Sequence, residues 1–182
     1  MFKVQYIPNL ITITRILFLP YLVWMLFHQQ FERSLLLMLF IGVSDGLDGF
    51  LARRYHWETK LGGYLDPIAD KIMLVSVYVT FAVLNWIPWW LAAIIVARDA
   101  VLLLGAFSYH LVTKQLQMEP LLISKVNTFM QILLAVSLIY SQVNPLNPQL
   151  LNAMMAVTLC TTIASGIGYV LEWSKRAVRA CH

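Results

Sequence analysis

Long apolar runs separated by short polar or turn-rich stretches make up most of this 182-residue chain. A transmembrane helix needs about 20 predominantly apolar residues to cross ~30 Å of hydrocarbon. Runs of this length occupy roughly Ile7 to Phe27, Ser34 to Ala52, Gly62 to Leu84, Ile87 to Leu111, Leu122 to Tyr140 and Leu150 to Trp173. The pattern predicts an all-α integral membrane protein with about six transmembrane helices.

The composition supports this prediction. Hydrophobic residues make up 60% of the chain, charged residues only 12%, and the mean hydropathy is +0.72. These values exceed what the core of a soluble domain needs, so we expect residues 1–182 to form one membrane domain, with membrane lipid and no nucleic acid as a partner. The first apolar run lacks a small-residue cleavage site and a transit-peptide composition, which indicates a retained span and favours a bacterial inner membrane.

Basic residues are distributed unevenly between the two ends of the predicted spans. With a cytoplasmic amino terminus, the cytoplasmic loops and tail carry Lys3, Arg53, Arg54, Lys60, Lys114, Lys175, Arg176 and Arg179. The opposite loops then carry only Arg33. Because cytoplasmic loops of membrane proteins are enriched in Lys and Arg, this orientation is favoured, and the region between the second and third spans faces the cytoplasm.

Four aspartates lie in this same region. Asp45 and Asp48 are three residues apart, and Asp66 and Asp70 are four apart, so each pair shares one face of a helix. Four carboxylates close together repel one another, so the arrangement requires a cation. An all-oxygen ligand set favours Mg²⁺ or Mn²⁺ over zinc, and two divalent ions are expected.

A single aspartate near the end of a membrane helix can simply cap it or pair with an arginine. Four at helical spacing favour a functional site, because intramembrane acids are costly. Gly49 and Ala52 leave space beside the acids, and Arg53 offers a fork-shaped cation for phosphate oxygens. These residues therefore predict a metal and diphosphate site.

The segment also resembles the signature of the CDP-alcohol phosphatidyltransferases, D-x2-D-G-x2-A-R-x8-G-x3-D-x3-D. The eight matching positions are Asp45, Asp48, Gly49, Ala52, Arg53, Gly62, Asp66 and Asp70. The resemblance implies that the first three acids bind metal and the diphosphate of a CDP-linked lipid. It further implies that Asp70 is the general base and can also touch a metal, that Gly49, Ala52, Arg53 and Gly62 line the nucleotide site, and that the protein is a homodimer.

Cations inside or at the edges of the apolar runs form a second group: Arg15, Lys71, Arg98 and Lys125. One interpretation is structural: Arg98 pairs with an acid on a neighbouring helix, and the lysines extend to the interface. The other is a positively lined pocket beside the acids, with Arg15, Arg98 and Lys125 binding a phosphate of the acceptor substrate. The residues alone leave both open.

Further segments, including PNLITITR and LLISKVNT, resemble the eukaryotic-type, CDP-diacylglycerol-dependent cardiolipin synthase branch of the family. The resemblance implies transfer of a phosphatidyl group from CDP-diacylglycerol to phosphatidylglycerol, giving cardiolipin and CMP. The main alternative is phosphatidylglycerophosphate synthase, whose acceptor is glycerol 3-phosphate. That enzyme has a second lysine where this chain has Asn127. A cation or proton transporter would explain the carboxylates but not Gly49, Ala52, Arg53 and Gly62 at fixed offsets.

Overall fold

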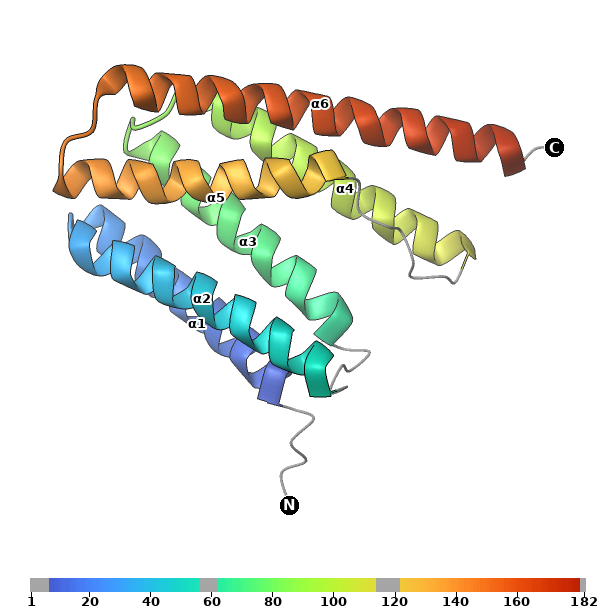
Figure 1. The fold of residues 1–182 in the computed structure, drawn as a ribbon, viewed down its shortest axis with the longest axis horizontal. Helices are drawn as coiled ribbons and strands as arrows, with labels where there is room; N and C mark the ends of the chain where they lie inside the picture. The colour runs from blue at the N-terminus through green and yellow to red at the C-terminus, as the bar shows by residue number, and fades with distance from the viewer. Residues whose placement is uncertain (1–6, 56–61, 114–121, 181–182) are drawn as a thin grey trace. The chain divides into compact units, whose positions relative to one another are not determined.

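In the structure, a computed structural model, the described residues form α-helices joined by short turns (Figure 1). It describes the backbone of residues 7–55, 62–113 and 122–180, and the side chains of residues 13–44, 46, 68–105 and 122–169. Within these ranges the helices are α1 (Ile7–Phe27), α2 (Phe31–Tyr55), α3 (Gly62–Val83), α4 (Trp89–Thr113), α5 (Leu122–Val143) and α6 (Pro148–Ala180). The predicted all-α fold class is confirmed.

The helices match the predicted runs one for one and differ from them mainly at their ends. α2 begins at Phe31 rather than Ser34, and α6 continues to Ala180 rather than ending at Trp173. Both extensions add polar or charged residues, which a hydropathy pattern excludes from a span although they continue a helix well.

The chain divides into two compact units. The first contains the residues up to Trp86 together with Ala135–Pro145, and the second contains Ile87–Leu134 together with the residues from Leu146 onward. α5 therefore contributes its first part to one unit and its last part to the other. In the first unit, α1 packs against both α2 and α3 (Figure 1). In the second unit, α4 packs against α6.

The core of the first unit is apolar and aromatic. Leu22 and Leu26 of α1 and Tyr78 and Phe81 of α3 are fully buried. Tyr78 and Phe81 meet edge to face, with ring centroids 5.9 Å apart, and the Phe81 ring stacks on Trp86 at 5.2 Å. Burial of large side chains of this kind stabilises the packing of α1 against α3, which holds the two helices in a fixed register for the site described below.

α1 and α3 end in the same way. Gln29 and Asn85 have φ values of 58° and 60°, in the left-handed region. The amides of Gln30 and Trp86, one residue later, donate to the carbonyls of Met25 and Phe81 at 3.0 and 2.9 Å. This is the Schellman arrangement, which supplies donors to the last helical carbonyls and ends each helix sharply.

α6 begins with a strong amino-terminal cap. The Asn147 side-chain Oδ1 accepts a hydrogen bond from the Gln149 amide at 2.9 Å, and Pro148 occupies the first helical position. Asparagine before proline is a favourable start, because the proline has no N–H to leave unsatisfied.

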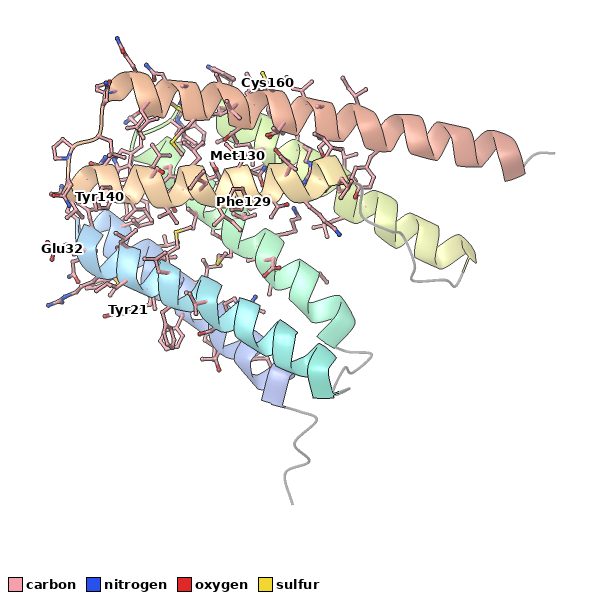
Figure 2. The ribbon with its side chains drawn as sticks, in the orientation of Figure 1. Tyr21, Glu32, Phe129, Met130, Tyr140 and Cys160 are labelled. Carbon is pink, nitrogen blue, oxygen red and sulfur yellow. The ribbon has the colours of Figure 1, made fainter. Side chains whose placement is uncertain are left out.

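Two helices of the described residues are long and apolar enough to cross a membrane: Leu122–Val143 and Pro148–Tyr169. Only 33% and 17% of their most apolar stretches are buried within the protein. Large apolar side chains are also exposed on other helices, among them Leu17, Tyr21, Leu36 and Phe40, and Phe129 is exposed on α5 (Figure 2). Outward-facing apolar surface on this scale is unlike the outside of a monomeric soluble domain. That all six helices cross a membrane stays a prediction.

Candidate functional site

The signature residues lie on two consecutive helices of the first unit. Asp45, Asp48, Gly49, Ala52 and Arg53 belong to the last part of α2, and Gly62, Asp66 and Asp70 to the first part of α3. Both pairs of acids are thus on helical backbone, at the i, i+3 and i, i+4 spacing that places each pair on one helix face. Six residues, 56–61, join the two helices and lie outside the described ones.

Asp70 is the signature residue whose side chain the structure describes, and it is held by an arginine of another helix. The Arg15 Nη1 atom of α1 donates a hydrogen bond of 2.7 Å to the Oδ1 atom of Asp70 in α3. The Arg15 side chain is 4% exposed and that of Asp70 is 41% exposed. A short contact between opposite charges is a charge-assisted hydrogen bond, roughly twice as strong as a neutral one. The buried guanidinium of Arg15 thus supports the accessible carboxylate of Asp70.

The metal-binding prediction falls largely outside the described side chains. Among the side chains that are described, no three acids, histidines or cysteines gather into a cluster that could hold a metal ion. The predicted ligands Asp45, Asp48 and Asp66 are not among those side chains. The donor set still fits a hard divalent cation, because carboxylate oxygens at helical spacing are ligands of the kind that Mg²⁺ and Mn²⁺ prefer.

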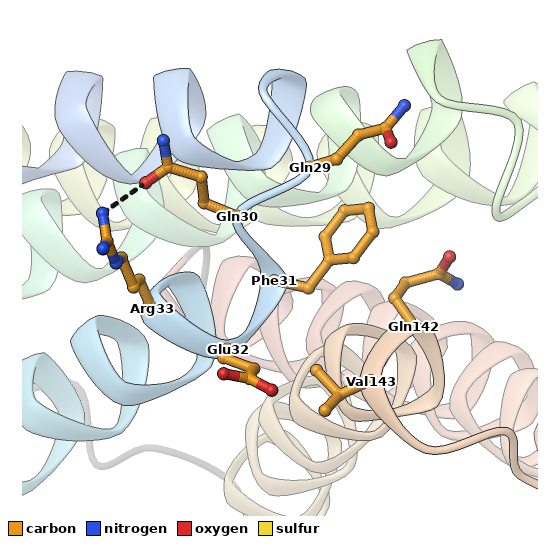
Figure 3. Close-up of a pocket in the computed structure, with 7 residues that line it drawn as sticks. All are labelled: Gln29, Gln30, Phe31, Glu32, Arg33, Gln142 and Val143. Atoms are coloured by element: carbon orange, nitrogen blue, oxygen red, sulfur yellow. Dashed lines mark hydrogen bonds between the residues drawn. The ribbon is translucent and has the colours of Figure 1, made fainter.

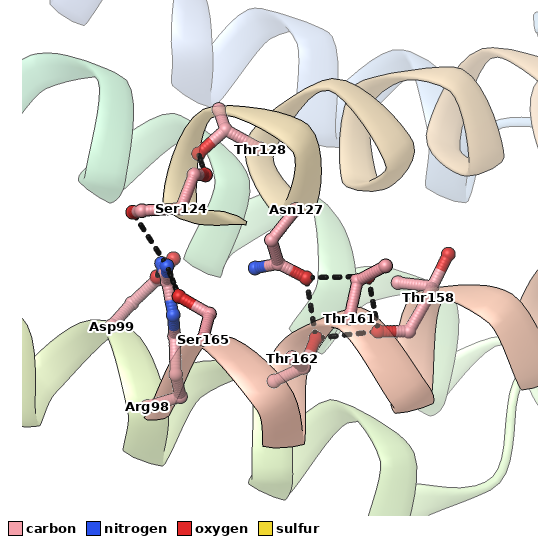
Figure 4. Close-up of polar contacts among 9 residues, drawn as sticks. All are labelled: Arg98, Asp99, Ser124, Asn127, Thr128, Thr158, Thr161, Thr162 and Ser165. Carbon is pink, nitrogen blue, oxygen red and sulfur yellow. Dashed lines mark hydrogen bonds and ion pairs between the residues drawn. The ribbon is translucent and has the colours of Figure 1, made fainter. Parts of the chain in front are cut away.

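A second polar cluster lies in the second unit and is built around Arg98 of α4 (Figure 4). Arg98 Nη1 donates to Asp99 Oδ1 at 2.6 Å, and its Nη2 donates to Ser124 Oγ of α5 at 2.7 Å and to Ser165 Oγ of α6. Arg98 is buried, and Asp99 is fully buried. A Cβ placed on Gly166 of α6 would lie 4.0 Å from the Arg98 Cγ atom, so the arginine stem runs along this helix. Arg98 therefore connects three helices.

Asn127 of α5 extends the polar cluster along α6. Its Oδ1 accepts hydrogen bonds from the hydroxyls of Thr161 and Thr162, both at 2.9 Å. The same hydroxyls lie 3.0 and 2.7 Å from the Thr158 carbonyl oxygen. Each hydroxyl has one proton and donates to one of these oxygens at a time. Asn127 is fully buried, so position 127 faces several oxygen atoms in the interior of this unit.

The three cations predicted to bind an acceptor phosphate are placed differently. Arg15 lies in the first unit, against Asp70, whereas Arg98 and Lys125 lie in the second. Arg98 is buried and bonded to protein groups, while Lys125 is exposed, one residue from Ser124. Their grouping into one pocket stays a prediction. The structural interpretation of Arg98 is supported in part, although its acid is the adjacent Asp99 rather than a residue of a neighbouring helix.

The sequence reasoning missed the hydroxyl and amide residues that accompany Arg98. They form two stripes with the same i, i+3, i+4, i+7 spacing, Ser124, Asn127, Thr128 and Gln131 on α5 and Thr158, Thr161, Thr162 and Ser165 on α6. Polar residues recurring at this spacing within apolar runs are the signal that could have revealed two helix faces turned towards each other.

A pocket of about 370 Å³ lies in the first unit, at the turn between α1 and α2 (Figure 3). It is lined by Gln29, Gln30, Phe31, Glu32, Arg33, Gln142 and Val143, and the Arg33 Nη1 atom donates to Gln30 Oε1 at 3.3 Å. α2 runs from this turn towards the signature residues at its other end, so the pocket is separate from them.

Comparison with known proteins agrees with the signature. The sequence profile of the CDP-alcohol phosphatidyltransferases matches residues 5–164. The chain is 33% identical to a "Probable cardiolipin synthase (CMP-forming)" of Drosophila melanogaster over 93% of this chain and 58% of the fly protein. It is 33% identical to the human "Cardiolipin synthase (CMP-forming)" over 90% of this chain and 60% of the human protein.

A third relative carries another name. It is the "CDP-diacylglycerol--glycerol-3-phosphate 3-phosphatidyltransferase" of Aquifex aeolicus, 30% identical over 92% of this chain and 91% of that protein. The chain thus spans about three-fifths of the length of the fly and human relatives and most of the length of the bacterial one. The family profile extends into both units and includes every signature residue and Arg15. The chain belongs to the CDP-alcohol phosphatidyltransferase family.

Proposed function

We propose that this protein transfers a phosphatidyl group from CDP-diacylglycerol to phosphatidylglycerol, forming cardiolipin and CMP. The observation that carries the proposal is the complete eight-residue signature on α2 and α3 within a chain that belongs to the family. The human relative is named a CMP-forming cardiolipin synthase and the fly relative a probable one, and both names support this choice of acceptor.

In the proposed reaction, the acceptor hydroxyl attacks the phosphorus nearer to diacylglycerol, and the bond from that phosphorus to CMP breaks. Asp70 takes the proton of the hydroxyl, and its partial exposure makes it accessible for this role. Asp45, Asp48 and Asp66 would hold one or two divalent ions, Mg²⁺ or Mn²⁺. When bound, such ions neutralise charge on the diphosphate. Gly49, Ala52, Arg53 and Gly62 would bind the CDP moiety.

The proposed setting is a membrane crossed six times, with the amino terminus and the signature residues on the cytoplasmic side of a bacterial inner membrane. The exposed apolar surface of the helices supports a lipid environment. The basic loops and tail support the orientation. A homodimer is proposed on the resemblance to the family. Metal-dependent release of CMP from CDP-diacylglycerol would separate this enzyme from a cation or proton transporter.

One alternative acceptor has a specific observation in its favour. The Aquifex relative, which this chain covers over 91% of its length, is named for glycerol 3-phosphate. This acceptor carries about two negative charges, whereas phosphatidylglycerol carries about one, so it requires more positive charge in the site. The neutral Asn127 at the position of the second lysine argues for phosphatidylglycerol.

The test is an acceptor assay with the purified full chain in mixed micelles. CDP-diacylglycerol and Mg²⁺ or Mn²⁺ are supplied with either phosphatidylglycerol or glycerol 3-phosphate, and both CMP and the lipid product are measured. Cardiolipin should form with phosphatidylglycerol, with little product from glycerol 3-phosphate. The reverse preference would refute the cardiolipin assignment and leave the family assignment in place.

A variant tests the physical basis of the acceptor choice. Asn127→Lys places a second cation among the oxygens of Thr158, Thr161 and Thr162 and should raise the use of glycerol 3-phosphate relative to phosphatidylglycerol. Gln131→Lys is the matched control, because residue 131 is also fully buried and lies one turn further along α5. Equal effects of the two lysines would show that position 127 does not set the preference.

A further inference from the structure

We infer that Arg15 is a positioning residue for Asp70. Its guanidinium holds the carboxylate that is proposed to take the proton from the acceptor hydroxyl, and it is not itself a ligand of the acceptor phosphate. The inference rests on the proposed function and assigns Arg15 a role different from the one expected from the sequence.

The contact joins two helices that already pack together. α1 and α3 are in contact in the first unit, and the 2.7 Å bond from Arg15 Nη1 to Asp70 Oδ1 crosses between them. Arg15 is eight residues after the first residue of α1, and Asp70 is eight residues after the first residue of α3. At about 1.5 Å per residue, both lie about 12 Å along their helices.

The side chains of Arg15 and Asp70 differ in exposure, which indicates that Arg15 positions the carboxylate and that Asp70 meets the substrate. A phosphate ligand must present its guanidinium to the substrate, but the Arg15 side chain is 4% exposed. Asp70, at 41%, can be reached. Because Oδ1 is bonded to a buried group fixed in α1, rotation of the carboxylate is restricted. The positive charge of Arg15 also offsets the charge of an acid that shares its site with three other acids and an anionic donor.

The experiment is a double-mutant cycle on the full chain, comparing wild type, Arg15→Met, Asp70→Asn and the double variant. For each protein, kcat and the acceptor KM are measured with saturating CDP-diacylglycerol. Arg15→Met should lower kcat by about 10- to 100-fold, the scale of a misplaced catalytic group, and change the acceptor KM by less than about 2-fold. In the Asp70→Asn background, Arg15→Met should cause little further loss of kcat, because residues that act as a unit are not additive.

Two results would overturn the inference. One is a raised acceptor KM with unchanged kcat, which identifies Arg15 as a phosphate ligand. The other is a kcat loss in the double variant equal to the product of the two single losses. Arg15→Lys keeps a buried positive charge, so it provides the same comparison should the methionine variant not fold. It should lower kcat less than Arg15→Met does and leave the acceptor KM unchanged. Arg33→Met, an exposed arginine at the opposite end of α2, is the control and should leave both constants unchanged.

A readout that does not depend on turnover separates this inference from the proposed function. The melting temperatures of the four proteins are measured in excess EDTA. Non-additive shifts support the Arg15–Asp70 contact, and strictly additive shifts contradict it. If wild type releases no CMP from CDP-diacylglycerol with any acceptor, the proposed function fails, whereas the melting temperatures still report on the contact.

Discussion

Replacing Arg98 by methionine should destabilise the protein strongly. Methionine keeps much of the apolar stem that runs along Gly166 but removes the guanidinium bonded to Asp99, Ser124 and Ser165. The fully buried Asp99 carboxylate then loses its guanidinium partner. Removing one member of a buried ion pair typically costs about 3–5 kcal/mol, because the remaining charge stays buried.

The individual contributions follow from the same contacts. Ser124→Ala or Ser165→Ala removes one hydrogen bond to a charged group, so each should cost about 1.5 kcal/mol, the lower end of the usual range, because Arg98 Nη2 keeps its other hydroxyl partner. In Arg98→Met/Asp99→Asn no buried charge of the pair remains, and most of the loss should be recovered.

The assay is reversible unfolding in mixed micelles, followed by helical circular dichroism, with the free energy of unfolding compared across the variants. The decisive comparison is between Arg98→Met and the double variant. A loss below about 1 kcal/mol for Arg98→Met, the range typical of an exposed ion pair, would refute the reasoning. A double variant no more stable than the single one would show that the buried charge is not the cause.

Two further predictions concern the metal and a helix end. Chelation with excess EDTA should abolish turnover, and Mg²⁺ or Mn²⁺ should restore it, because the predicted ligand set is entirely carboxylate; full CMP release in EDTA would contradict the metal assignment. Asn85→Gly should raise the free energy of unfolding by up to about 1 kcal/mol, since glycine adopts the φ of 60° at this position without strain. Asn85→Val should lower it, because a β-branched side chain is strained there. The reverse order of the two variants in an unfolding titration would mean that the left-handed conformation of residue 85 is unimportant.

The helices were predictable because each depends on a local property of the chain. An apolar run of about 20 residues and its polar flanks identify a helix without knowledge of its neighbours. The predicted bounds of α1 coincide with the observed ones. The ends of α2 and α6 differ because hydropathy reports where lipid contact stops, not where helical hydrogen bonding stops. Division of the chain into two units depends on long-range packing, which no local pattern contains.

In the candidate site, too, the local arrangement was predictable and the contacts between helices were not. Helical spacing alone places Asp45 with Asp48 and Asp66 with Asp70. Arg15, which bonds Asp70, lies 55 residues earlier in the chain, and Ser165 bonds Arg98 from 67 residues away. Such pairings depend on which helix faces meet, and one sequence without its packing does not specify them.

The exposed thiol of Cys160 on α6 offers a chemical test of the proposed membrane setting. Cys160 is twelve residues after the first residue of α6, about 18 Å along the helix. In the proposed membrane setting, this places it near the middle of a hydrocarbon layer ~30 Å thick. Because hydrocarbon excludes a water-soluble maleimide, we expect Cys160 to be labelled only after detergent replaces the bilayer. The sequence contains one other cysteine, Cys181, in the basic carboxyl-terminal segment. Labelling of Cys160 before and after detergent is added thus tests, in an unmodified chain, whether this part of α6 lies in the bilayer.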